Sequence, residues 1–215
     1  MLEQINLIPF EFFVAIGTVA FAMSGAFKAI RHDFDVLGLL VLGFSTAIGG
    51  GLIRDALLDH TPAAFIDSGP AVYALIGCAI VLLSHWFSKK STLGLTRPES
   101  RVFLALDAIG LAAFTVLGAQ AGAGANLNFF GIIMLAALTG VGGGMIRDVL
   151  AGEVPLVLKA DFYATATIIG AIVFIALTRF SFDPAIVSTV TFIVTLLLRL
   201  LAIQYKWQLP KPKIY

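Results

Sequence analysis

Two short stretches of the chain place an arginine and an aspartate shortly after three glycines. The first, GGGLIRDALL, runs from Gly49 to Leu58, and the second, GGGMIRDVLA, runs from Gly142 to Ala151. A charged side chain inside a membrane helix costs about 2.5–3.5 kcal/mol on insertion scales, so its presence indicates a functional site. The two stretches therefore predict an ion or substrate path beside their charged residues, which are Arg54, Asp55, Arg147 and Asp148.

The composition is that of a membrane protein. Of the 215 residues, 59% are hydrophobic and 13% are charged, and the mean hydropathy is +0.98. Because a helix needs roughly 20 apolar residues to cross a bilayer, the charge-free runs predict seven spans. They lie at residues 9–27, 36–57, 70–88, 101–121, 128–150, 162–179 and 185–205. The predicted fold is a single all-α integral membrane domain over 1–215, with a short tail at 206–215.

The chain contains an internal duplication. Shifting it by 93 residues aligns 16–62 with 109–155 without a gap, and 17 of these 47 pairs are identical. Each unit, 9–88 and 101–179, holds three spans, and the seventh helix at 185–205 stands outside the repeat. Because three is odd, the second unit enters the membrane from the opposite face. Inverted repeats of this kind are typical of channels and transporters.

The distribution of lysine and arginine predicts the orientation, since short cytoplasmic loops hold the excess. On the N-terminal side of the membrane lie only Arg54 and Arg179. The other side holds Lys28, Arg31, Lys89, Lys90, Arg97, Arg101, Arg147, Lys159, Arg199, Lys206, Lys211 and Lys213. We expect a multi-pass protein of the inner (plasma) membrane with its N-terminus outside and its C-terminus in the cytoplasm. The basic tail is read as an anchor, with a lipid-binding patch as the alternative.

The glycine triplets allow two interpretations. Glycine costs about 1 kcal/mol relative to alanine in a helix interior, so three in a row are expected to break the second and fifth spans. The alternative is close helix packing through small residues. The predicted path includes both triplets and the polar residues near them. These are Gly49, Gly50, Gly51, Gly142, Gly143, Gly144, Ser45, Thr46, Thr139, Asp107 and Lys28.

The charges of each motif need partners. Arg54 and Asp55 are neighbours on a helix and point about 100° apart, so we expect that they do not satisfy each other. One hypothesis is that the two motifs pair with each other, or that each pairs with polar groups of the first and fourth helices. The alternative is that both pairs extend to the membrane interface.

Several other functions find no support in the sequence. The histidines, at positions 32, 60 and 85, have no ligand spacing, so no metal site is expected. The single cysteine, Cys78, excludes an intrachain disulfide. There is no catalytic triad or phosphate loop, so no enzyme is predicted, and a net charge of +1 argues against nucleic acid.

At these motifs the sequence resembles the prokaryotic relatives of the trimeric intracellular cation (TRIC) channels, a family also filed under a "glycine transporter" domain name. The resemblance rests on seven spans, the duplicated three-helix unit, and GGG-x-I-R-D-x-L in the second and fifth helices. It implies a homotrimer with a pore in each subunit, bounded by those two helices and weakly favouring K⁺ over Na⁺. A phosphoinositide-binding basic motif of the animal members is absent. The expected ligands are permeant K⁺ or Na⁺ and bound membrane lipid, without a cofactor.

A different class of function stays open from the residues alone. Arginines in a pore favour anions, while carboxylates and helix C-terminal carbonyls favour cations, so one of each per repeat leaves the sign of the ion undecided. In a secondary transporter of a small zwitterion or anion, such as an amino acid, half-helix N-termini after each triplet would bind a carboxylate. A membrane scaffold is the third hypothesis, and it gives the charges in the spans no role.

Overall fold

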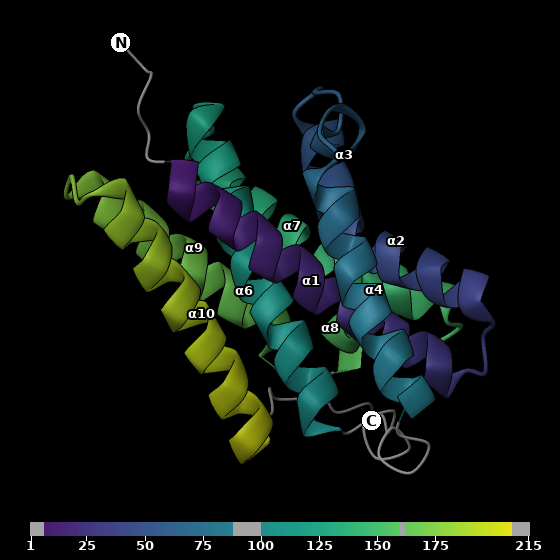
Figure 1. Ribbon diagram of the computed structural model, residues 1–215. Coiled ribbons are helices and arrows are strands. Elements are labelled where there is room, and N and C mark those ends of the chain that lie inside the picture. Colours follow the sequence, from purple (N-terminus) through teal and green to yellow (C-terminus); the bar gives the residue numbers. More distant parts are fainter. Residues whose placement is uncertain (1–6, 88–99, 160–161, 208–215) are drawn as a thin grey trace, which may run out of the picture.

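The computed structural model describes residues 7–87, 100–159 and 162–207, which form helices joined by short turns (Figure 1). The helices are α1 (Leu7–Arg31), α2 (Val36–Leu57), α3 (Ala63–Ile66), α4 (Gly69–Phe87), α6 (Arg101–Gly124), α7 (Phe129–Leu150), α8 (Leu156–Lys159), α9 (Tyr163–Arg179) and α10 (Pro184–Tyr205). Six of them are long and apolar enough to cross a membrane, and α9 is a shorter apolar helix of 17 residues. The predicted all-α membrane fold is confirmed, with six membrane-length helices and the shorter α9 at the seven predicted positions.

Most predicted boundaries agree with the structure to within one residue, but two helices are longer than predicted. The α1 helix continues to Arg31, four residues beyond its expected end, because Lys28 and Arg31 hold its last turn through ion pairs described below. The α6 helix continues to Gly124. The cationic positions 89, 90, 97, 211 and 213, and the tail from residue 208 on, lie outside the described residues.

The repeat extends into the helix caps and turns. Asp35 caps α2 by accepting a hydrogen bond from the backbone N–H of Gly38 at 2.7 Å, and Asn128 caps α7 through Gly131 at 2.8 Å. These positions are 93 residues apart, as in the duplication. The turns before the caps also match, since Asp33 and Asn126 both have a φ of 55°. The two units therefore share their turn geometry as well as their apolar pattern.

The pseudo-symmetry is visible in the centre of the bundle. Phe21 of α1 and Phe114 of α6 stack with ring centroids 5.3 Å apart. Figure 1 shows α1 crossing the front of the bundle and α10 along its left side, with α3 at the top of the view and α8 in its lower half. Because α3 and α8 follow the two motifs, the motifs face opposite ends of the bundle. This arrangement fits the predicted inversion.

Candidate functional site

The two glycine triplets lie where α2 and α7 cross. A Cβ atom on Gly50 would overlap the backbone carbonyl oxygen of Thr139, and a Cβ on Gly143 would overlap that of Thr46. The glycines thus let the two helix backbones touch, as small residues do in membrane bundles. The crossing is itself pseudo-symmetric, since position 46 corresponds to 139 and position 50 to 143.

The predicted break of the second and fifth spans is wrong. Residues 49–51 and 142–144 are helical, within α2 and α7 that each run for 22 residues. The physical reason is the contact just described: the helix–helix packing that glycine permits offsets its lower helix propensity, so the backbone keeps its own hydrogen bonds. The packing interpretation of the triplets is the one that the structure supports.

The first motif forms a local ion pair. The Nε and Nη2 atoms of Arg54 lie 2.7 Å from Oδ1 of Asp55, and Oδ2 of Asp55 accepts a hydrogen bond from the backbone N–H of Ala63 at 2.9 Å. The expectation that neighbouring residues cannot satisfy each other is therefore wrong. The long arginine side chain bends back to its neighbour, which the angle between Cα–Cβ bonds does not reveal. Asp55 also anchors the chain where it turns into α3.

The second motif repeats this arrangement and adds to it. Arg147 Nε donates to Asp148 Oδ1 at 2.8 Å, and Asp148 Oδ2 accepts from the backbone N–H of Leu156 at 2.7 Å, eight residues on, as at the first motif. In addition, Arg147 Nη1 donates to Asp107 of α6 at 2.7 Å and to Ser24 of α1 at 3.0 Å. The side chain of Arg147 is 0% exposed. Hence this guanidinium is enclosed by protein and does not extend to the surface of the bundle.

The hypothesis that the motifs pair with each other is not supported. Among the described residues, no salt bridge joins Arg54 to Asp148 or Arg147 to Asp55. The other form of the hypothesis, pairing with polar groups of the first and fourth helices, holds for the second motif. The structure brings together four predicted residues there, namely Lys28, Asp107, Arg147 and Asp148.

A cluster of ion pairs continues from Asp148 towards the end of α1. Lys28 Nζ lies 2.5 Å from Asp148 Oδ1 and 3.0 Å from Glu153 Oε2. Glu153 also pairs with Arg31, and its Oε1 lies 2.8 Å from Nε2 of His32. Lys28 is 2% exposed, whereas the Glu153 side chain is 23% exposed. The cluster therefore joins the buried motif to the surface of the bundle.

On its other side the network reaches the seventh helix of the fold. The Tyr163 hydroxyl of α9 donates to Asp107 Oδ1 at 3.2 Å, and the guanidinium of Arg199 in α10 lies 4.6 Å from the centroid of the Tyr163 ring. Arg147 in turn lies 4.9 Å from the centroid of the Phe103 ring. Such cation–π contacts stabilise charges held away from water. Through Tyr163, α10 is coupled to a motif that belongs to the repeat.

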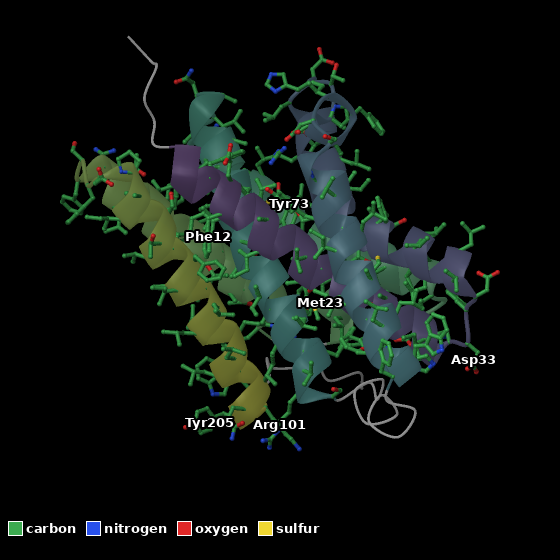
Figure 2. The ribbon with its side chains drawn as sticks, viewed as in Figure 1. Phe12, Met23, Asp33, Tyr73, Arg101 and Tyr205 are labelled. Atoms are coloured by element: carbon green, nitrogen blue, oxygen red, sulfur yellow. The ribbon has the colours of Figure 1, made fainter. Side chains whose placement is uncertain are left out.

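A cavity of about 430 Å³ opens beside the first motif. Arg54 and Asp55 line it together with two further carboxylates, Glu11 at the start of α1 and Asp67 after α3. The lining also includes Thr18, Ala47, Ile48, Gly51, Phe114 and Leu117. Figure 2 labels another lining residue, Tyr73, in the upper half of the view, on the side where α3 lies. Because Arg54 is paired with Asp55, Glu11 and Asp67 give the lining a net negative charge.

The hydroxyls predicted along the path bond to their own helices. Ser45 donates to the carbonyl of Val41, Thr46 to that of Leu42 and Thr139 to that of Leu135, each at 2.6 Å. Thr46 and Thr139 are buried at the crossing of α2 and α7, but Ser45 lies outside it. None of the three joins the charged network among the described residues.

Several residues that sequence reasoning missed have no matching residue in the other unit of the repeat. Glu153 aligns with His60, Tyr163 with Pro70, and Ser24 with Leu117. A comparison of the two units position by position, which sets the carboxylate of Glu153 against the imidazole of His60, is the signal that could have found Glu153.

The fold and the site together define a polytopic α-helical membrane protein built as an inverted repeat. A family model described as "Glycine transporter" matches residues 11–86 and, 93 positions later, residues 104–179. The UPF0126 inner membrane protein YadS of Escherichia coli (strain K12) is 39% identical over 201 residues, which cover 91% of this chain and 92% of that protein. The chain belongs to this family of prokaryotic TRIC channel relatives.

Two solved structures show how closely the fold agrees. One, from work on conductance through TRIC cation channels, is 41% identical with a TM-score of 0.80, covering 95% of this chain and 97% of that one. The other is a trimeric intracellular cation channel orthologue from Rhodobacter sphaeroides, 29% identical with a TM-score of 0.81, covering 94% of this chain and all of that one. Both similar structures are channels for cations.

Proposed function

We propose that this protein is a passive channel for monovalent cations that conducts K⁺ with weak selectivity over Na⁺. The observation that carries the proposal is the agreement of the whole chain with a TRIC cation channel at 41% identity and a TM-score of 0.80. The path within one subunit runs along the crossing of α2 and α7, from the cavity beside Asp55 to the ion-pair cluster around Asp148. The glycine triplets shape this path by bringing the two helices together.

The charges near the cavity support a cation as the permeant ion. Each motif arginine is matched by its own aspartate, so the motifs are locally neutral. Glu11 and Asp67 remain as negative charges at the wide end of the path. A cleft lined by one sign of charge raises the local concentration of the opposite ion. The lining therefore concentrates cations where the cavity opens.

The proposed assembly is a homotrimer in the inner membrane, surrounded by lipid, with the N-terminus outside and the C-terminus in the cytoplasm. The trimer follows the description of the Rhodobacter sphaeroides relative as trimeric, and the membrane follows that of YadS as an inner membrane protein. In Figure 2, Arg101 and Tyr205 lie at the lower end of the bundle, away from α3. The lysine and arginine bias of the sequence supports the assignment of this end to the cytoplasm.

The carrier hypothesis loses its structural basis in the continuous helices. It required half-helix N-termini after each glycine triplet to bind a carboxylate, and α2 and α7 have no such ends at the triplets. The description of the matching family still names glycine, so glycine is the substrate to test.

Purified protein in planar bilayers provides the test of the channel. We expect unitary current steps and, under a KCl gradient, a reversal potential displaced towards the K⁺ equilibrium value. Replacing K⁺ by Na⁺ should shift the reversal potential only slightly. Glycine counterflow in liposomes that show no unitary currents would instead establish a carrier.

A further inference from the structure

The ammonium group of Lys28 has the surroundings of a bound monovalent cation. Its nitrogen contacts one oxygen of Asp148 at 2.5 Å and one of Glu153 at 3.0 Å, and it lies 5.9 Å from the centroid of the Phe103 ring. Carboxylate oxygens and aromatic faces are groups that attract cations. Lys28 itself is 2% exposed and extends from the last turn of α1.

The repeat shows what the same motif looks like without this lysine. By the 93-residue offset, Lys28 corresponds to Ala121, which carries no charge. Asp55 is the counterpart of Asp148. It pairs with Arg54 and accepts a hydrogen bond from the backbone N–H of Ala63, and it lines the 430 Å³ cavity. Thus one motif aspartate borders a space large enough for a hydrated ion, and the other holds a lysine ammonium.

The charge balance of the cluster also indicates that a cation is needed beside Asp148 and Glu153. Three cationic side chains face three carboxylates, so removal of one lysine leaves an uncompensated buried negative charge. These side chains are Lys28, Arg31, Arg147, Asp107, Asp148 and Glu153.

The cluster also contains polar atoms without partners. Asp107 Oδ2 and Arg147 Nη2 have no hydrogen-bond partner in the part of the chain that the structure describes, and both side chains are 0% exposed. Since buried polar groups are ordinarily satisfied by protein, water or an ion, the cluster has capacity for a further ligand.

We propose that Asp148 and Glu153 form a binding site for a monovalent cation at the cytoplasmic end of the path, and that Lys28 occupies this site as a tethered, competing cation. Conduction then requires the ammonium to leave and a free ion to take its place. The inference rests on the proposed channel function for its role in conduction, but the binding site itself can be tested without current measurements.

The test compares thermal unfolding of the purified protein in KCl and in the chloride salt of N-methyl-D-glucamine, a cation too large for the site, at constant ionic strength. Wild type should melt at the same temperature in both salts because Lys28 fills the site. For Lys28→Met, the melting temperature should rise with K⁺ by roughly 3 °C for each tenfold increase above the dissociation constant.

Matched variants separate this site from general effects of charge. Lys159→Met removes an exposed lysine from the same end of the molecule and should melt like wild type in both salts. Lys28→Met combined with Asp148→Asn should lose the K⁺ dependence. If Lys28→Met does not fold, Lys28→Gln takes its place, because its amide can donate a hydrogen bond to either carboxylate without supplying a charge.

The outcomes distinguish the two proposals. Stabilisation of the Lys28 variant by K⁺, with no current from any protein, would support the site and contradict the channel. Normal wild-type currents, unchanged in the Lys28 variant, together with identical melting in both salts, would overturn the site and leave the channel in place. If both hold, the Lys28 variant should open several-fold more often than wild type.

Discussion

Gly50 of α2 lies directly against the backbone carbonyl of Thr139 in α7, so that no Cβ atom fits at this contact. Gly143 and Thr46 repeat this contact across the pseudo-symmetry axis. The two contacts hold the helices that bound the proposed path at a fixed separation. Their effect on stability and conduction can be measured one glycine at a time.

We expect Gly50→Ala and Gly143→Ala to destabilise the protein by about 1–3 kcal/mol each, the usual cost of overpacking a core, and to change the unitary conductance. Gly51→Ala is the control within the same triplet, because a Cβ there meets nothing within 4 Å. It should leave stability unchanged or raise it by up to about 1 kcal/mol. Melting temperatures in detergent measure the difference, and equal values for Gly50→Ala and Gly51→Ala would contradict it.

The third glycine of each triplet should respond differently in the two units. A Cβ on Gly144 would lie 2.7 Å from the Tyr163 hydroxyl, close to Arg147 and Asp107, whereas its counterpart Gly51 has open space. Gly144→Ala should therefore lower the melting temperature, while Gly51→Ala does not. If the two alanine variants melt alike, the second motif is not packed as described.

The two motif arginines should differ in their contribution to stability. Arg147→Gln leaves Asp107 and Asp148 buried with one cation fewer, and loss of one partner of a buried pair costs about 3–5 kcal/mol. Arg54→Gln affects a side chain that is 12% exposed and pairs only with Asp55 among the described residues, so we expect a smaller loss. Unfolding curves of the Arg147→Gln and Arg54→Gln variants measure the two losses of stability.

Both arginine substitutions should still alter conduction, since each arginine stands beside the proposed path. Normal currents from both variants would contradict this placement of the path.

Tyr163 can be divided into its hydroxyl and its ring. Tyr163→Phe removes one hydrogen bond to Asp107 and should cost about 1 kcal/mol, while the ring stays beside Arg199. Tyr163→Ala also removes the ring and should cost about 3–5 kcal/mol. Similar melting temperatures for these two variants would show that the ring contributes little and that α10 is held by other contacts.

Glu11 and Asp67 should determine how strongly the cavity favours cations. We expect Glu11→Gln combined with Asp67→Asn to move the reversal potential in a KCl gradient towards zero, with little effect on melting. Asp33→Asn is the control: it removes a carboxylate that does not line the cavity, and asparagine tolerates the φ of 55° at that position. An unchanged reversal potential in the double variant would exclude these carboxylates from ion selection.

Charge-free runs and the 93-residue offset were sufficient to predict the helices and the duplication. The predicted boundaries of α2 agree with the structure at both ends, where Asp35 caps the start of the helix and the motif occupies its last turns. Asp107 and Lys28 could be proposed as site residues because a charge within a span is costly.

The contacts of these residues could not be predicted from the sequence. The pairing of Lys28 with Asp148 joins positions 120 residues apart, and it depends on how α1 packs against α7. The predicted helix breaks at the glycine triplets were wrong for the same reason. Helix propensity describes an isolated helix, whereas Gly50 and Gly143 each pack against the backbone of a neighbouring helix. Arg54 contacts Asp55 because its long side chain can bend back along the helix, whereas a helical wheel represents only the direction of each Cα–Cβ bond.

The glycine crossing also bears on how such a chain could have arisen. Two identical three-helix chains, inserted in opposite directions, would make the contact between Gly50 and Thr139 twice, so an ancestral dimer of half-length subunits could already form the crossing. The pairing of Lys28 with Asp148 has no counterpart in the other half, where the matching position, 121, is alanine. Two identical subunits would form such a pairing in both halves or in neither, so a contact present in one half alone requires halves of different sequence.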